Sequence, residues 1–299
     1  IMKHIHILFF CSLCLLFSCR KLEVAAPDFD VSISGTTFKA GDTLRVSFSG
    51  QADNITFYSG EPGFSYQYKD RTAADGIPQL QFTSYLQNRG EANTLKLLVS
   101  TDFNGAYDSA GILKATWTDL TAQALLSTGA DKTPSGIIDL SAFAKQQRPV
   151  YIALRYLGYY SDSLKQPSWS IRTFDIKHVL PDKVSTIVAT SQVGWAAFDL
   201  KNPTVAWNVP TSGQVVINGT IANSTKEDND DWLISRPFDL RTVVRDAGVS
   251  IRDLGSATVD SYYYIYNKPG TYTLTFVAFN DSIDEHREVV RTFTITVTP

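Results

Sequence analysis

The sequence predicts an all-β protein built from two β-sandwiches. Apolar and polar residues alternate with a period of two through most of the chain, and Gly, Pro, Asn and Asp separate the alternating stretches. Long apolar stripes with the 3.6-residue period of a helix are missing from the sequence. With 299 residues, 43% of them hydrophobic, the chain is long enough for two domains with separate cores.

The N-terminal segment is predicted to be a lipoprotein signal peptide covering residues 1–18. It has a basic residue, Lys3, near its start and continues with about a dozen mostly apolar residues, fewer than the roughly 20 that a membrane span needs. The stretch "LFSC" at 16–19 resembles the bacterial lipobox, in which the cysteine becomes the N-terminus and carries the lipid. We therefore expect lipidation of Cys19 and a tether over 19–27, with a plain cleaved signal as the alternative.

The first sandwich is predicted to be split between residues 28–75 and 256–299. "TLRVSFSG" at 43–50 alternates as a half-buried antiparallel strand, and so do "GTYTLTFVAFN" at 270–280 and "RTFTITVTP" at 291–299. The last two look like the closing strands of a PKD-type or immunoglobulin-like sandwich. Because loop closure costs grow slowly with length, a surface turn of such a sandwich can accept an inserted domain.

The insert, residues 76–255, is predicted to be a jelly-roll. "LKLLVSTDFNG", "ATWTDLT", "GIIDLSAF", "PVYIALRY" and "SWSIRTFDI" follow the order found in jelly-rolls of the adhesin and anchor-associated type. The motif "NDDWLISRPFDL" at 229–240, whose counterpart opens those domains, comes last here. We interpret this order as a circular permutation, which is compatible with chain ends that lie close together.

These features, with "FYSGEPGFSYQYKDR" at 57–71, resemble the Bacteroidetes-type surface lipoproteins of domain-of-unknown-function family 5017. The resemblance implies a protein anchored in the outer membrane beside a nutrient importer of the starch-utilisation type, and it implies no reaction. Such exported lipoproteins often carry acidic residues after the cysteine, whereas Arg20 and Lys21 follow here. The resemblance implies the cell surface as the location, and this departure from the acidic pattern leaves the periplasmic face of the membrane as the alternative.

Aromatic residues in turns are the candidate ligand-binding groups. Sugar rings stack on aromatic faces while amide and carboxylate groups bind their hydroxyls, so Tyr159, Tyr160 and Asp162 in "YLGYYSDS" form one candidate. Trp207 and Asn208 in "WNVPTSG" form another. The alternative for both is an aromatic side chain that merely covers the sheet. The strand tryptophans of "ATWTDL", "SWSI" and "DWLI" are expected in the core.

The acidic run "KEDNDD" at 226–231 suggests a structural calcium site at Asp228, Asp230 and Asp231, because hard cations take several oxygen ligands. The run lacks the spacing of a calcium-loop signature, so a solvated acidic loop is the favoured alternative. No other cofactor is expected.

The net charge and the missing catalytic motifs argue against two classes of function, nucleic-acid binding and catalysis. A net charge of −3 argues against nucleic acid as a partner. The sequence lacks the nucleophile elbow, the zinc-protease motif and a phosphate-binding glycine loop, so we expect a non-enzymatic protein. The leading hypothesis is glycan binding for an outer-membrane importer. The alternatives are a protein- or peptide-binding accessory of that importer and, less favoured, a glycoside hydrolase with a pair of carboxylates.

Overall fold

The computed structural model describes residues 23–88, 93–219 and 227–299. Strands make up nearly all of its regular structure, so the predicted all-β class is confirmed. The chain divides into two compact units, one containing the residues up to Asp70 together with Asp246–Pro299, and the other containing Arg71–Arg245. Cys19 lies outside the described residues. Within the described part of the chain, no helix is long and apolar enough to span a membrane.

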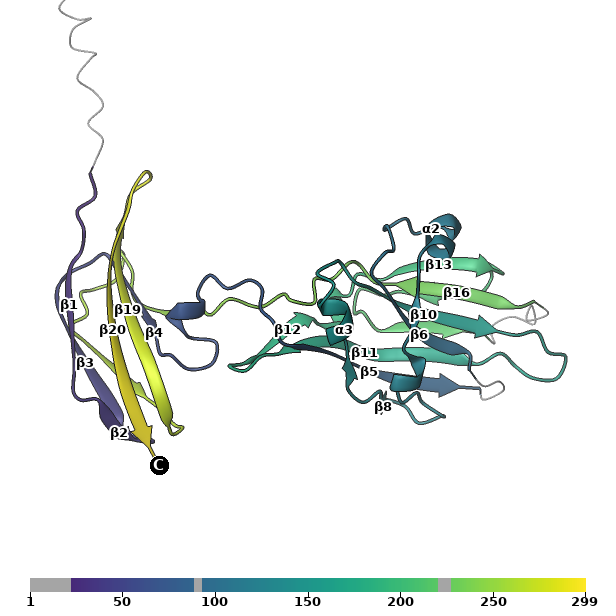
Figure 1. Cartoon of the computed structure of the whole chain (residues 1–299), viewed down its shortest axis with the longest axis horizontal. Helices are drawn as coiled ribbons and strands as arrows, with labels where there is room; N and C mark the ends of the chain where they lie inside the picture. The colour runs from purple at the N-terminus through teal and green to yellow at the C-terminus, as the bar shows by residue number, and fades with distance from the viewer. Residues whose placement is uncertain (1–22, 89–92, 220–226) are drawn as a thin grey trace, which may run out of the picture. The chain divides into compact units, whose positions relative to one another are not determined.

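The smaller unit is a sandwich of two sheets, and Figure 1 shows that its strands come from both ends of the chain, drawn in purple and yellow. One sheet has the order β1-β3-β18, with bounds Asp28–Ile33, Thr43–Gln51 and Ser261–Ile265. The other has the order β17-β4-β19-β20-β2, with bounds Val249–Arg252, Asn54–Tyr58, Gly270–Asp281, His286–Thr298 and Thr37–Lys39. Only the β2–β20 pair among these is parallel.

Alternation along the strands fills the smaller unit with aromatic rings. Phe57 stacks on Phe276 with ring centroids 4.9 Å apart. Tyr262 and Tyr264 approach Phe57 edge-on, with centroids 5.2 and 5.1 Å away. Tyr263 points from the opposite face of β18 and is 54% exposed. Since side chains along a strand alternate between its faces, the run of tyrosines is divided between core and solvent.

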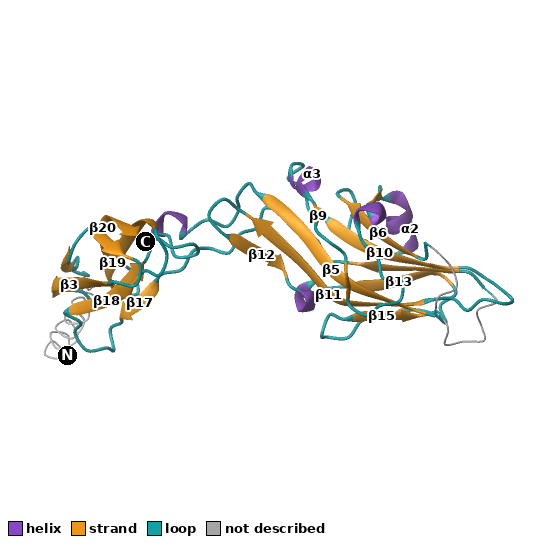
Figure 2. Ribbon diagram, turned by 90° about the horizontal axis from the view of Figure 1, so that it is seen from below, coloured by secondary structure: helices purple, strands orange, loops and turns teal. Residues whose placement is uncertain are grey.

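The larger unit also contains two sheets, with short helices at their margins (Figure 2). The five-stranded sheet has the order β13-β16-β10-β6-β7, with bounds Ala196–Lys201, Asn229–Ile234, Tyr151–Gly158, Leu95–Ser100 and Thr118–Asp119. The main path of the seven-stranded sheet is β14-β15-β11-β5-β8, with bounds Trp207–Asn208, Val215–Asn218, Ser168–Val179, Ile77–Gln87 and Thr133–Pro134. Strand β12 (Val184–Val188) pairs with β11, and β9 (Ile138–Asp139) pairs with β5. The helices are α2 (Ser109–Lys114) and α3 (Ser141–Ala144).

Hydrophobic residues fill both faces of the five-stranded sheet. One face joins the seven-stranded sheet in the main core, where Leu154 and Trp169 are buried. Each fully buried large apolar side chain there contributes about 1.5–3 kcal/mol. The other face carries a second cluster in which Trp232 packs with Phe103 and with Ile112 of α2. Strand β16 is therefore buried along its whole length, so it does not show the usual alternation between core and solvent.

The unit boundaries differ from the predicted ones, which lay after residues 75 and 255. Ala73 forms a β-bridge with Thr242, and Arg71 pairs with Asp182 through two hydrogen bonds of 3.1 and 2.5 Å, so 71–75 belong to the larger unit. Strand β17 pairs with β4 and so belongs to the smaller unit. The sequence predicts such boundaries poorly, because a connecting segment belongs to the unit that contains its strand partner, and local residues do not reveal that partner.

The segment predicted as a tether over 19–27 is ordered at its end. The Val24 amide donates to the Glu285 carboxylate at 3.1 Å, and the Asn280 side chain donates to the Ala25 carbonyl at 3.0 Å.

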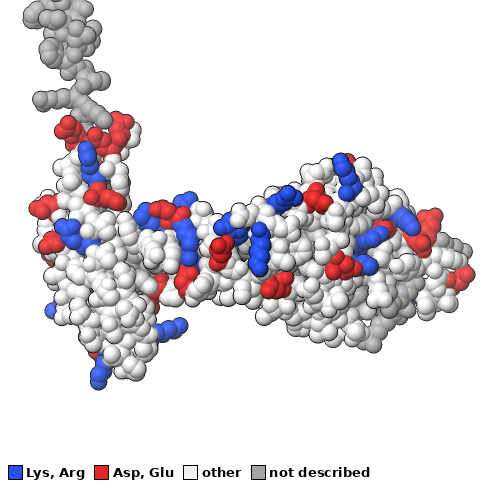
Figure 3. Space-filling view, in the orientation of Figure 1, with Lys and Arg blue, Asp and Glu red and all other residues white. Residues whose placement is uncertain are grey.

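Carboxylates gather at this β19–β20 turn, whereas positive and negative side chains are interspersed on the face of the larger unit shown in Figure 3.

Candidate functional site

The loop between β10 and β11 presents two tyrosines to solvent. Tyr159 is 46% exposed and Tyr160 is 45% exposed. The Tyr160 amide donates to the Asp228 carboxylate at 2.9 Å, and the Gln166 side-chain amide donates to the Tyr159 carbonyl at 3.3 Å. Asp162 accepts a hydrogen bond from the Tyr160 hydroxyl and raises the pKa of that hydroxyl. These bonds hold the backbone of the loop and the Tyr160 hydroxyl in place, and we name Tyr159, Tyr160 and Asp162 the tyrosine platform.

A charged pair on neighbouring strands β10 and β16 supports the start of this loop. Arg155 donates to both oxygens of Asp230, at 2.7 and 2.6 Å, and its guanidinium lies 5.0 Å from the centre of the Trp232 ring. The Trp232 indole donates to the same carboxylate at 3.0 Å. Planar two-point pairs of this kind hold both side chains in one geometry.

The predicted calcium set of Asp228, Asp230 and Asp231 is not brought together. Asp228 binds the tyrosine platform and Asp230 binds Arg155, whereas Asp231 points to the opposite face of β16 and is fully buried. In the described ranges, no group of three or more His, Cys, Asp or Glu side chains could hold a metal ion. The favoured alternative, a solvated acidic loop, is also wrong for Asp230 and Asp231, because β16 is covered on both faces.

Trp207 was predicted as a ligand platform, and the structure places it in the core instead. The side chain is only 5% exposed, and its indole donates to the Asp231 carbonyl at 3.3 Å. Strand β14 is two residues long and lies at the edge of its sheet, so Trp207 turns inward while Asn208 faces out. Two residues are too few for the alternation to show which face is buried. Trp207 and Asn208 therefore lie on opposite faces of β14 and do not form one ligand-binding site.

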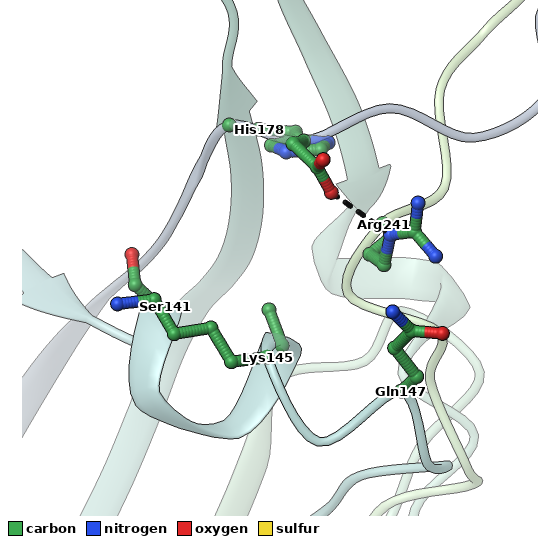
Figure 4. A pocket seen from close by; sticks show the side chains of 8 residues that line it. Ser141, Lys145, Gln147, His178 and Arg241 are labelled. Carbon is green, nitrogen blue, oxygen red and sulfur yellow. Dashed lines mark ion pairs between the residues drawn. The ribbon is translucent and has the colours of Figure 1, made fainter.

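A polar pocket of about 300 Å³ lies elsewhere in the larger unit (Figure 4). The residues around it are Asp75, Gly76, Ser141, Ala144, Lys145, Gln147, His178 and Arg241. Arg241 and Gln147 lie on one side, and Ser141 and Lys145 lie on the other. The Arg241 Nε is 3.3 Å from an oxygen of Asp75.

The wall of this pocket is tightly packed at His178, which is 1% exposed. Its Nδ1 lies 3.3 Å from the Thr242 carbonyl oxygen. A Cβ on Gly76 would be only 2.6 Å from the His178 Nε2, so glycine allows this close approach. The cationic groups of Lys145 and Arg241 suit ligand hydroxyls or a carboxylate. Sequence reasoning did not find this pocket, because its residues come from four separate segments that carry no shared motif.

Comparisons with known proteins identify the family of this chain. A search of curated proteins found none that matches the chain. A family model described as a domain of unknown function, DUF5017, matches residues 18–195. This match covers more than half of the 299 residues and includes the tyrosine platform, while Asp228 lies beyond it. The chain therefore belongs to the DUF5017 family.

Proposed function

We propose that this protein is a non-catalytic, lipid-anchored module that captures glycan for an outer-membrane nutrient importer. The observation that carries the proposal is the tyrosine platform, whose two rings are 46% and 45% exposed on a loop that hydrogen bonds to Asp228 and Gln166 hold in place. Hydrophobic rings gain free energy by leaving water, so an exposed and fixed pair is better suited to a ligand than to the fold. Aromatic faces bind the apolar C–H faces of sugars, and Asp162 is placed to accept hydrogen bonds from their hydroxyls.

The expected anchor supports a role outside the cytosol. The lipobox-like stretch ends at Cys19, and acyl chains on that residue would hold both units at a membrane. Mass spectrometry of the N-terminal peptide from cells tests this part separately. Acylated Cys19 supports the anchor, and an unmodified or absent cysteine in the mature protein contradicts it.

Glycan binding is tested by affinity electrophoresis and calorimetry across a polysaccharide panel. We expect retardation by at least one glycan and an affinity about 10-fold lower for Tyr160→Ala, which corresponds to losing about 1.4 kcal/mol of stacking. Tyr263→Ala is the matched control, because that tyrosine is 54% exposed but lies on the smaller unit. Both variants should keep the melting temperature of the parent.

Binding that is lost equally in both variants, or no retardation by any glycan, contradicts the proposal.

Leu164, 49% exposed on the same loop, favours a second candidate function, the capture of a peptide or an importer subunit. This function predicts co-purification with an outer-membrane partner that depends on Tyr160 and is insensitive to added glycan.

A further inference from the structure

Two carboxyl groups lie opposite each other inside the larger unit. Asp199 of β13 and Asp231 of β16 are directly paired in the antiparallel register. Asp231 has no exposed surface, whereas Asp199 is partly exposed. Side chains that face each other across an antiparallel pair lie on the same side of the sheet, about 4.5–5.5 Å apart at Cβ. Strand pairing therefore places a buried acid next to a second acid.

The oxygens of this pair lack donors. Among the residues that the structure describes, no N–H or hydroxyl group donates to the buried side-chain oxygens of Asp231 or to the buried Oδ1 of Asp199. The neighbouring Asp230 is different, because Arg155 and the Trp232 indole satisfy its carboxylate. A buried carboxylate without a partner costs several kcal/mol, so two adjacent ones need a proton or a cation between them.

Within the described ranges, the surrounding side chains do not supply that cation. The groups that act electrostatically on Asp231 are Asp199 and Asp230, and both are negative. Lys201 follows Asp199 on β13, but the register shifts between them and its ammonium lies 3.9 Å from Asp228 instead. Burial, followed by the contact with Asp199, raises the pKa of Asp231 to about 9, so without a cation the pair holds one proton at neutral pH.

We propose that Asp199 and Asp231 bind a calcium ion between β13 and β16. Calcium takes six to eight oxygen ligands in irregular geometry, and two carboxylates supply up to four of them. Water reaches the partly exposed Asp199 and can complete the shell from that side. Magnesium needs near-ideal octahedral geometry and zinc favours nitrogen and sulfur, so calcium suits a pair that offers only oxygen.

The consequence is a calcium-dependent link between an edge strand and its neighbour. Strand β13 forms the edge of the five-stranded sheet, and β16 is its only partner in that sheet as described. A bound ion that bridges them stabilises the folded larger unit by mass action. Saturating calcium should raise the melting temperature of that unit by roughly 5–10 °C.

The test uses the full chain, purified with EDTA and then freed of it. Thermal unfolding is followed by circular dichroism in EDTA, in millimolar calcium and in millimolar magnesium, and calorimetry measures the stoichiometry. We expect one calcium per chain, the stated rise in melting temperature, and little effect of magnesium. Terbium offers a second readout, because the Trp207 indole, bonded to the Asp231 carbonyl at 3.3 Å, should sensitise its luminescence.

Asp231→Asn should abolish both calcium responses, and Asp228→Asn, a control on the same acidic run, should keep them. If Asp231→Asn fails to fold, Asp199→Asn replaces it, since that side chain is partly exposed and its loss is easier to accommodate. A parent protein that ignores calcium overturns the proposal. A pair that merely shares a proton would instead lose stability progressively as the pH rises from 3.8, the ordinary pKa of an aspartate, to about 9, in calcium and in EDTA alike.

Discussion

Replacing Trp232 with alanine tests whether the outer face of β16 is a true core. The side chain is 4% exposed and lies in the cluster beneath α2, with its ring centroid 5.2 Å from that of Trp117. Its indole also donates to Asp230 at 3.0 Å. Removing a buried tryptophan costs about 3–5 kcal/mol, because transfer free energy is lost and a cavity remains.

This loss should appear in one unfolding transition only. For a unit of this size, about 4 kcal/mol corresponds to a melting temperature lower by about 8–16 °C. The two units have separate cores, so urea unfolding followed by circular dichroism should show the transition of the larger unit shifted and that of the smaller unit unchanged. Trp232→Phe, which keeps a ring but loses the hydrogen bond, should fall between the parent and Trp232→Ala.

Tyr160→Ala is the counterpart on the platform. Because its ring is 45% exposed, its removal should change the free energy of unfolding by no more than about 0.5 kcal/mol. The reasoning would be refuted if Trp232→Ala cost less than about 1 kcal/mol, or if Tyr160→Ala cost as much as Trp232→Ala. Either result would mean that core and surface are assigned to the wrong residues.

Two further predictions concern the smaller unit. Gly60 has φ +79°, and a Cβ there would lie 2.6 Å from the Thr273 carbonyl oxygen, so Gly60→Ala should lower stability in urea unfolding by more than about 1 kcal/mol. Gly41→Ala, at φ +91° in open space, should cost less, and equal losses would argue against the close contact. Asp281 at 2.5 Å is the main cause of the raised pKa of His286, so imidazole titration by NMR should give a value above 6.5 that falls in Asp281→Asn. The stability from this pair is present below pH 6.5 and is lost as the pH rises through the raised pKa; an unshifted titration would show that the pair does not form.

Alternation in the sequence was sufficient to predict strands where one face of the strand is buried and the other is wet. In β18, Tyr262 and Tyr264 point inward and Tyr263 points outward, as a period of two requires. The same reasoning failed at β16, because that strand is buried on both faces and its aspartates resemble a solvated run. It also failed at Trp207, since a two-residue strand has no period.

The sequence by itself determined the all-β class, the strand-rich segments on both sides of the insert and the exposed loop that carries Tyr159 and Tyr160. These features depend on the local pattern of apolar and polar residues, which is the same whichever strands later pair with each other. Only the tertiary structure decided which residues from separate strands meet, such as Asp199 with Asp231, and which segments enclose the pocket at Arg241. Strand register and burial on both faces arise from long-range pairing, and that pairing leaves no short-range pattern in the sequence.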